Sequence, residues 1–592
     1  MVRRFRQGLR LLVPLKRLAR SEQMVLAPLA VVIGATAAVG AIAFREALGY
    51  IQFGFYFIRS EQLYSWAETL PWWQVMLAPA AGGLLVGLYL RFVMPGGRPQ
   101  GVAEVIEAMA LKGGQMPLKA GFGAAVVSAL SLGAGASAGR EGPVVHLGAS
   151  LAAWFAARLH LNTQFARTIL GCGVASAVAA SFNAPIAGVF FALEVVIGHY
   201  ALRAFAPIVI AAVTGTVLSR LYFGDFPAFI VPAHEITSIL EFPAFALLGV
   251  VSAAVAIIFM GSIMFADKVV ASIPTPSWLA PVAGGLAVGL IALVFPQVLG
   301  VGYQSTDEAL NELLLLELLI GLIVAKTAAT AITLGCRFGG GVFSPSLFLG
   351  AMLGGAFGLI ATQAAPELSS GTGAYTMVGM GAVAGAVLGA PISTILMIFE
   401  LTGDYQLTIA VMIATVIASV ITQQVLGHSF FTWQLARRGV DLEGGRELGV
   451  LRATHVDDLM HRIIKTVTTA AGPAEIREHL RREPRGPVFV VDEAGRLKGT
   501  ITLPDLADVA FDTSLDALIK ATDVMRPNPP LLAAGDDVET VVGMLSAAAE
   551  PYVAVVDNRR DMKLVGCLHE HDAMVFYSRT LAAAREEQRG ER

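Results

Sequence analysis

The stretch Ser137-Ala-Gly-Arg-Glu-Gly-Pro-Val-Val-His-Leu-Gly148 places an arginine and a glutamate inside a long apolar region. Charged side chains at membrane depth are costly and commonly mark an ion pathway. The glycines allow the backbone to turn sharply, and Pro143 suits the first turn of a helix. We therefore expect Glu141 to lie just before a helix N-terminus, whose unpaired N–H groups and partial positive charge favour an anion. The alternative is a structural ion pair between Arg140 and Glu141.

The composition is that of a multi-pass membrane protein. Of the 592 residues, 55% are hydrophobic and 15% are charged, whereas soluble domains carry about 25% charged residues. The many glycines and alanines suit the close approach of helices in lipid. The three cysteines are far apart, which predicts free thiols rather than a disulfide or a metal site. Six apolar runs approach the roughly 20 residues that span a bilayer: Met24–Ile42, Val75–Leu90, Ala204–Leu218, Ala244–Phe265, Leu279–Phe295 and Leu315–Leu334.

Residues 24–440 are expected to form one membrane domain with two halves, at about 24–220 and 240–435. Three of its apolar segments are too short to span the bilayer, and each follows a glycine, proline or asparagine. Broken helices at membrane depth occur where they line a cavity or are buried in protein. The three short segments are Val144–Ala156, Ile186–Ile197 and Val342–Leu353.

The two halves repeat the same motifs. Gly139–Pro143 in the first half corresponds to Gly341–Pro345 in the second, and Pro185–Glu194 corresponds to Pro391–Glu400 with the same spacing. Matching broken helices in two halves predict an inverted repeat with an ion site at the interface, near the middle of the bilayer. The glutamates that end the second pair of segments are expected to cap or pair rather than to conduct ions.

The N-terminal segment, residues 1–23, is basic. Clustered Lys and Arg beside the first apolar run predict that this end lies in the cytoplasm. A nucleic-acid-binding arm is the less favoured interpretation, and we expect no nucleic-acid partner. The basic residues are Arg3, Arg4, Arg6, Arg10, Lys16, Arg17 and Arg20.

The C-terminal region has the character of a soluble domain built from two repeats, residues 451–515 and 516–580, followed by a charged tail, residues 581–592. Each repeat reads as a strand, a turn, a strand and then a helix that begins near an aspartate, Asp505 or Asp572. One such unit is too small to bury its own core. We therefore expect the two copies to pack as a pair.

The two glycine-rich motifs could pass an anion across a membrane. Helix N-termini supply N–H donors without a full buried cation, so an ion is held and can still leave. Val342 and Phe343 are expected to contribute backbone amides. Ionised, Glu141 would act as a tethered anion that blocks the site; burial favours its protonated form, so the pathway should open more readily at low pH. We find no nucleophile–base pair or metal cluster in the sequence. We therefore expect no catalytic site and no metal site, and we do not expect the protein to be an enzyme.

The motifs Gly-Arg-Glu-Gly-Pro143, Gly-Val-Phe-Ser-Pro345 and Phe182-Asn-Ala-Pro185 resemble the signatures of the CLC family of chloride channels and anion/proton exchangers. The C-terminal repeats resemble a pair of CBS domains. The resemblance implies an all-α polytopic membrane protein with an inverted repeat and broken helices, followed by a small α/β CBS pair. It also implies a homodimer with one pathway per subunit and chloride as the ligand.

Site residues follow from the same resemblance. Glu141 corresponds to the family's gating glutamate. Gln100 stands where the family has a serine, Phe431 where it has a central tyrosine, and Val195 where exchangers have a proton-relay glutamate. Two hydroxyl donors to the anion are thus replaced, which leaves the preferred anion open. The residues expected around the anion are Gln100, Gly139, Arg140, Gly142, Val342, Phe343 and Phe431.

The CBS pair resembles modules that bind adenine nucleotides, and implies that ATP, ADP or AMP meets Thr502, Asp505, His569 and Asp572. A purely structural pair is the alternative. No cofactor is expected to be required.

These observations favour a passive anion channel gated by Glu141, with voltage or pH as the trigger, in the inner membrane of a bacterium with the CBS pair in the cytoplasm. An anion/proton exchanger is the alternative. A membrane-anchored adenine-nucleotide sensor is a third interpretation, from a different class.

Overall fold

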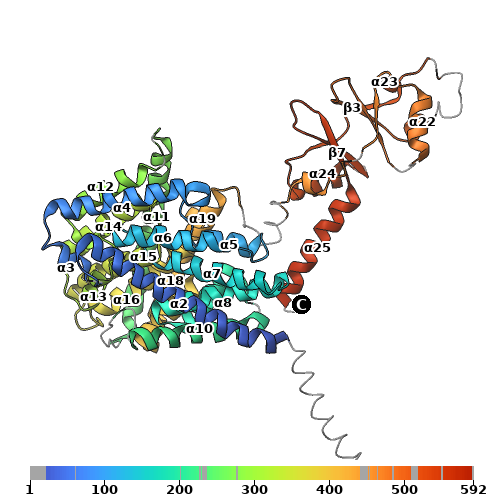
Figure 1. Ribbon diagram of the computed structural model, residues 1–592. Coiled ribbons are helices and arrows are strands. Elements are labelled where there is room, and N and C mark those ends of the chain that lie inside the picture. The colour runs from blue at the N-terminus through green and yellow to red at the C-terminus, as the bar shows by residue number, and fades with distance from the viewer. Residues whose placement is uncertain are drawn as a thin grey trace, which may run out of the picture. The chain divides into compact units, whose positions relative to one another are not determined.

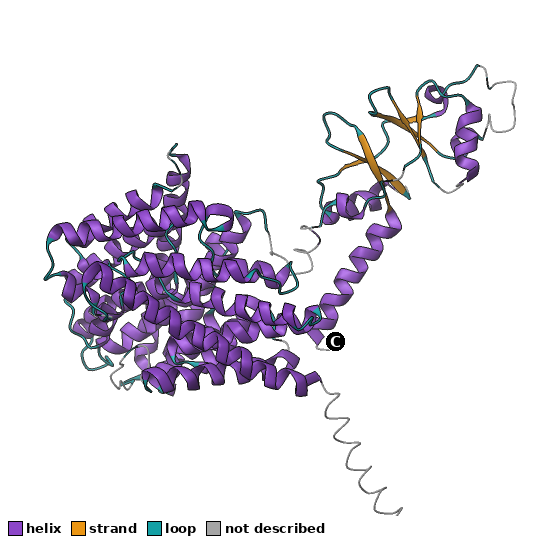
Figure 2. Ribbon diagram, in the orientation of Figure 1, coloured by secondary structure: helices purple, strands orange, loops and turns teal. Residues whose placement is uncertain are grey.

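The computed structural model describes residues 22–60, 62–200, 202–225, 229, 236–274, 276, 278–440, 451, 454–462, 464–482, 486–507, 516, 518–548 and 551–589. The chain divides into two compact units, Met1–Arg438 and Gly439–Arg592. Figure 2 shows that the described part of the first unit is helical and that the strands belong to the second. The predicted basic segment, residues 1–23, lies almost entirely outside the described residues.

The first half of the membrane unit runs from α2 to α10, and its helices α2, α7, α8 and α10 lie side by side (Figure 1). Its elements are α2 (Glu22–Tyr56), α3 (Leu63–Ala67), α4 (Trp72–Phe92), η1 (Pro95–Gly97), α5 (Val102–Ala110), α6 (Leu118–Gly133), α7 (Glu141–Arg158), α8 (Thr163–Phe182), α9 (Pro185–Phe191), the π-helical η2 (Ala192–Ile197) and α10 (Leu202–Phe223).

The second half runs from η3 to α19, and α15 packs along α16. Its elements are η3 (Ile239–Glu241), α11 (Phe242–Ser272), α12 (Ala280–Ala292), η4 (Pro296–Val298), α13 (Tyr303–Leu310), α14 (Leu316–Gly335), α15 (Phe343–Ala364), α16 (Thr372–Leu388), α17 (Pro391–Thr402), α18 (Tyr405–Leu426) and α19 (Phe430–Ala436).

Eight of the described helices are long and apolar enough to cross a bilayer, which confirms a multi-pass membrane protein. Two length predictions were wrong. Val342–Leu353 was expected to be too short to span, yet α15 has 22 residues. Leu279–Phe295 was expected to approach spanning length, but α12 has 13 residues, because Pro296 cannot continue a helix and disfavours the helical conformation before it.

The length of α15 was misread because its glycines serve packing. A β-carbon on Gly354 would lie 2.2 Å from the carbonyl oxygen of Tyr375, and one on Gly350 would lie 2.3 Å from that of Gly379. The glycines therefore mark the close approach of α15 to α16, as is common between helices in membranes. They do not end the helix.

The two halves cap each other's short helices. The carboxylate of Glu400, near the end of α17, accepts the N–H groups of Ile186 and Ala187 at the start of α9, at 2.8 and 2.7 Å. In the mirror contact, the carboxylate of Glu194 accepts the N–H groups of Ile392 and Ser393 at the start of α17, at 3.0 and 2.8 Å. The predicted capping role of the two glutamates is confirmed.

The second unit contains two small sheets, of order β1-β2-β3-β4 and β5-β6-β7. In each, the first pair of strands is parallel and the second pair antiparallel. Its elements are α21 (Val456–Leu459), β1 (Thr466–Thr468), α22 (Pro473–Arg482), β2 (Val488–Val491), β3 (Leu497–Ile501), η5 (Pro504–Leu506), α23 (Ala521–Val524), β4 (Arg526–Pro527), β5 (Leu531–Ala533), α24 (Val538–Ala548), β6 (Tyr552–Val556), β7 (Leu564–His569) and α25 (Glu570–Arg589).

The two sheets pack on each other and share one apolar cluster, which includes Phe489 and Val556. The packing does not follow the repeat boundaries read from the sequence. Val456, from the start of the first repeat, packs in the core of the second sheet, and Ala521, from the second repeat, packs in the core of the first. The described residues of the expected tail, 581–589, continue α25.

Candidate functional site

The N-terminal tips of α7 and α15 meet inside the membrane unit. The residues just before them, Gly139 and Gly341, form an isolated antiparallel bridge in which each N–H donates to the other's carbonyl oxygen, at 2.7 and 2.8 Å. Arg140 and Val342 then take the equivalent N-cap positions. The first N–H groups of a helix have no partner within the helix, so two sets of donors converge from opposite halves of the chain.

Glu141 is the first residue of α7, one position later than the expected place just before the helix, and its side chain is 1% exposed. Its Oε1 accepts the hydroxyl of Tyr303 at 2.8 Å and lies 3.8 Å from Nε of Arg140. Its Oε2 has no hydrogen-bond partner among the described residues. One oxygen of the carboxylate is thus held and the other is buried without a donor.

The position of Gly139 shows how close the carboxylate is to α15. A β-carbon added there would lie 2.9 Å from Oε2 of Glu141, 3.1 Å from the carbonyl oxygen of Gly341 and 3.1 Å from the amide nitrogen of Ser344. The carboxylate therefore lies beside the N-terminal tip of α15. Any larger residue at Gly139 would occupy this space.

A third helix terminus borders the site. α5 begins after Gly101, whose N–H donates to Glu104 at 2.7 Å, and a β-carbon on Gly142 would lie 3.9 Å from Val102. Gln100 precedes this terminus and is half-buried. Phe431 is buried on α19, which packs on α5. The two substituted positions thus lie on elements that adjoin the tips; whether their side chains meet an anion stays a prediction.

The ring of Phe343 packs as an ordinary core aromatic. Its centroid lies 4.9 Å from that of Phe182 and 5.9 Å from that of Phe191. Any role of Phe343 toward an anion therefore rests on its backbone amide.

The structure brings together six of the predicted residues: Gly139, Arg140, Glu141, Gly142, Val342 and Phe343.

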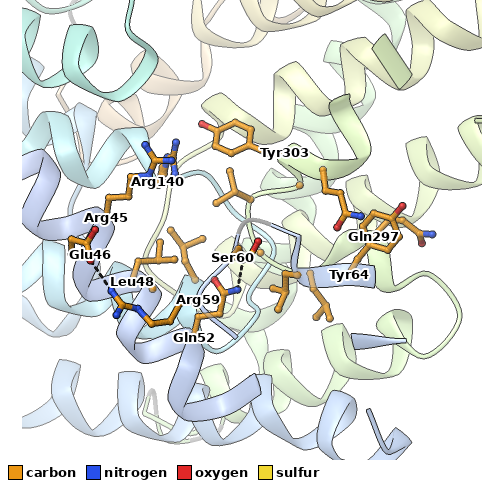
Figure 3. Close-up of a pocket in the computed structure, with 18 of the residues that line it drawn as sticks. Arg45, Glu46, Leu48, Gln52, Arg59, Ser60, Tyr64, Arg140, Gln297 and Tyr303 are labelled. Atoms are coloured by element: carbon orange, nitrogen blue, oxygen red, sulfur yellow. Dashed lines mark hydrogen bonds and ion pairs between the residues drawn. The ribbon is translucent and has the colours of Figure 1, made fainter. Parts of the chain in front are cut away.

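A cavity of about 220 Å³ reaches the two side chains that touch the carboxylate, Arg140 and Tyr303. Figure 3 shows the guanidinium groups of Arg140 and Arg45 close together, with the ring of Tyr303 beside them. Arg59 also lines the cavity and pairs with Glu46 at 2.8 Å. Three guanidinium groups against one lining carboxylate make the wall attractive to anions.

Tyr303 was missed in the sequence. It begins α13, a polar helix without an apolar pattern, and its partner Glu141 is 162 residues away. Two features of the sequence could have pointed to this turn. Gly300 and Gly302 lie just before Tyr303, and Lys326 is a lysine inside the apolar run of α14. Lys326 is fully buried, and its Nζ donates to the carbonyl oxygens of Val298 and Gly300, both at 3.0 Å.

The other predicted positions lie elsewhere. Val195 is half-buried in the π-helical η2. Asp505 accepts the N–H of Thr502 at 2.7 Å and pairs with Arg526 at 3.1 Å. Asp572 pairs with His461 at 2.8 Å. The ring of His569 accepts the N–H of His571 at 2.9 Å. The carboxylates of Asp505 and Asp572 thus both have protein partners. Nucleotide binding by the CBS pair stays a prediction.

Comparison with known proteins identifies the family. The family model for the voltage gated chloride channel matches residues 82–423, which contain all three signature motifs. The chain belongs to the voltage-gated chloride channel (CLC) family. A CBS domain model matches residues 456–512. The proteins that this chain resembles are named as channels and transporters rather than as enzymes.

This CLC chain is 33% identical, over 414 residues, to a ClcB-like chloride channel protein of Ralstonia nicotianae, a match that covers 69% of this chain and 96% of that protein. Its fold is similar to that of a slow cyanobacterial Cl⁻/H⁺ antiporter, with a TM-score of 0.62, 21% identity, and coverage of 70% and 97%. A eukaryotic CLC transporter aligns over 92% of this chain and 97% of its own, with a TM-score of 0.61 and 18% identity.

Proposed function

We propose that this CLC protein passes chloride or a similar monovalent anion across the membrane as a passive channel, and that Glu141 is its gate. The observation that carries the proposal is the buried Glu141 carboxylate at the meeting point of α7 and α15. A mobile anion held by the N–H groups of the two tips would occupy the space beside this carboxylate. The two would therefore compete for one place.

Protonation would free the site. A neutral carboxyl is held less strongly by helix N-termini than a carboxylate, so an anion displaces it more easily. The expected behaviour is a flux that rises as the pH falls. The arginine-lined cavity beside Arg140 and Tyr303 is the proposed entrance, because its charge concentrates anions outside the gate.

Passive conduction, rather than exchange, is proposed because of Val195. Coupled exchange needs a group that carries a proton from the far side of the membrane, and a valine side chain cannot be protonated. The position lies in η2, next to the capping residue Glu194, whose carboxylate already accepts two backbone N–H groups. An anion/proton exchanger is the outcome that the experiment must separate from a channel.

The test is anion flux through the purified full-length protein in liposomes and planar bilayers. A channel gives a reversal potential set by chloride alone, whereas an exchanger gives one that shifts when a pH gradient is imposed. Glu141→Gln should raise chloride flux at pH 7 and remove its pH dependence, while Glu317→Gln, at an exposed carboxylate in the first turn of α14, should behave as the wild type. Absence of chloride, nitrate and fluoride flux in both wild type and Glu141→Gln would refute anion transport.

We also propose that the protein works as a homodimer with one pathway per subunit, in a bacterial inner membrane with the CBS pair in the cytoplasm. The basic N-terminal segment supports this orientation, because Lys and Arg beside the first span favour the cytoplasmic side. Single-molecule photobleaching of labelled protein in liposomes should give two bleaching steps. One step in most particles would contradict the dimer.

A further inference from the structure

A tyrosine hydroxyl from the second half of the chain holds the carboxylate from the first. Tyr303 is buried, and its O–H donates to Oε1 of Glu141 at 2.8 Å. Hydrogen bonds from a donor to an ionised acceptor are stronger than neutral ones. We propose that Tyr303 is a latch that keeps ionised Glu141 in its blocking position and sets the pH at which the pathway opens. The inference rests on the proposed gating role of Glu141.

The ring of Tyr303 is fixed from two sides. The guanidinium carbon of Arg140 lies 4.5 Å from the ring centroid, in a cation–π contact. The ring of Phe229 meets it edge-on at 4.9 Å, with an angle of 80° between the planes. A ring held in this way has little freedom to rotate, so its hydroxyl stays directed at the carboxylate.

The backbone before Tyr303 is fixed as well. Gly302 is the N-cap of α13 with φ of +94°, a conformation that side-chain-bearing residues rarely adopt. The N–H of Gly300 donates to the carbonyl oxygen of Gly135 at 3.2 Å, which ties this turn to the segment that leads into α7. Lys326 binds the carbonyl oxygens of Val298 and Gly300. The turn that presents the hydroxyl is thus attached to both halves of the protein.

Among the described residues, few charged groups lie near the carboxylate besides its own neighbour. Arg140 precedes it, and from α2 Arg45 lines the same cavity. Glu104 on α5 is paired with Arg438 at 2.6 Å. From α14, Lys326 approaches the turn before Tyr303, since a β-carbon on Gly302 would lie 3.3 Å from its Nζ. On α7 itself, His146 is fully buried. Tyr303 is the described side chain that makes a hydrogen bond to Glu141.

The latch has a definite consequence for gating. A donor that binds the ionised carboxylate more strongly than the neutral one favours the ionised form. Removing the hydroxyl should therefore weaken the hold on the ionised carboxylate. The pH at which chloride flux reaches half its maximum should rise, and the maximum itself should change little, because the anion's own amide donors are untouched.

The experiment measures chloride flux against pH for Tyr303→Phe in liposomes. We expect the half-maximal pH to rise by about one unit, which corresponds to about 1.4 kcal/mol. The matched control is Tyr375→Phe, which removes the hydroxyl of another buried tyrosine, on α16; its profile should equal that of the wild type. 3-Fluorotyrosine at position 303, a stronger donor of similar size, should shift the half-maximal pH downward.

Three outcomes with Glu141→Ala separate the latch from the gate. If Glu141→Ala has a flat, high flux and Tyr303→Phe adds nothing to it, the hydroxyl acts through the carboxylate as proposed. If Glu141→Ala has that flux but neither Tyr303→Phe nor the fluorinated variant moves the profile, the latch is refuted and the gate stands. A Glu141→Ala profile equal to that of the wild type would refute the gate and the latch together. The fluorinated variant keeps the test decisive should Tyr303→Phe fail to fold.

Discussion

Removing one of the two reciprocal caps should destabilise the membrane unit. In Glu400→Ala the N–H groups of Ile186 and Ala187 would lose both carboxylate oxygens, which accept them at 2.8 and 2.7 Å. Loss of a side-chain cap costs about 0.5–2 kcal/mol, and each hydrogen bond to a charged group is worth about 1.5–3 kcal/mol. We expect a loss of about 2 kcal/mol in the free energy of unfolding.

The opposite cap should matter more. Glu194 accepts the N–H groups of Ile392 and Ser393 and also the hydroxyl of Ser393. We expect Glu194→Ala to cost about 3 kcal/mol, since one more hydrogen bond to the charged group is lost. Ser393→Ala removes that hydroxyl alone and should cost about 1 kcal/mol.

The buried thiols provide the assay. Cys172 and Cys336 are buried in the membrane unit and Cys567 in the second unit, so a thiol-reactive fluorophore in a Cys567→Ser background reports unfolding of the membrane unit. One kcal/mol shifts the melting temperature by about 2–4 °C in domains of 150–250 residues, and by less in larger ones. We therefore expect Glu400→Ala to melt about 2–4 °C below the wild type in detergent.

Controls decide whether the caps are responsible. Glu317→Ala removes an exposed carboxylate from the first turn of α14 and should melt within about 1 °C of the wild type, because exposed charges at helix termini contribute little. The double variant Glu194→Ala/Glu400→Ala should show the sum of the two losses, if the caps are independent. A melting temperature of Glu400→Ala equal to that of Glu317→Ala would show that the reciprocal caps do not stabilise the fold.

Two further predictions concern single positions. Gly139→Ala should lower chloride flux at pH 7, because its β-carbon would lie 2.9 Å from Oε2 of Glu141 and 3.1 Å from the amide nitrogen of Ser344 and so occupy the space between the helix tips; an unchanged flux would contradict this. In the CBS unit, the N–H of Arg496 donates to Asp492 and lowers the pKa of this carboxyl. The ionised form therefore stabilises the β2–β3 turn above pH of about 3.9 and the effect is lost as the pH falls further. Asp492→Asn should speed hydrogen exchange in Leu497–Ile501 at pH 7 but not below pH of about 3, and equal exchange at pH 7 would be against it.

Repeated motifs were the most informative part of the sequence. The match between Gly139–Pro143 and Gly341–Pro345 predicted two helix tips that meet, and the bridge between Gly139 and Gly341 confirms it. The spacing of Pro185–Glu194 and Pro391–Glu400 predicted capping, which the N–H contacts confirm. Such features are predictable because a charged residue or a proline within an apolar run is stable in few environments at membrane depth.

The remainder depended on contacts between distant segments. Tyr303 lies in a short polar helix, and its role depends on where Lys326 and Gly302 place the turn before it. The length of α15 depended on whether Gly354 ends a helix or packs against α16, and glycine permits both. In the CBS unit, Val456 and Ala521 each pack on the sheet of the other repeat. Because the two repeats have similar sequences, the sequence alone does not show which sheet each segment packs on.

In the proposed mechanism, weak binding at the helix tips would allow the Glu141 gate to move. Partial charges at a helix N-terminus stabilise an anion by about 0.3–2 kcal/mol, which is less than the attraction of a desolvated lysine or arginine in direct contact. Arg140 does approach Oε1, but at 3.8 Å, beyond a good hydrogen bond, while its guanidinium also stacks on Tyr303. Because Oε2 has no described donor, half of the carboxylate gains little from its position. We therefore propose that a chloride ion bound at the amides of the tips would have a small difference in free energy to overcome, and that a proton on the carboxyl would remove most of it.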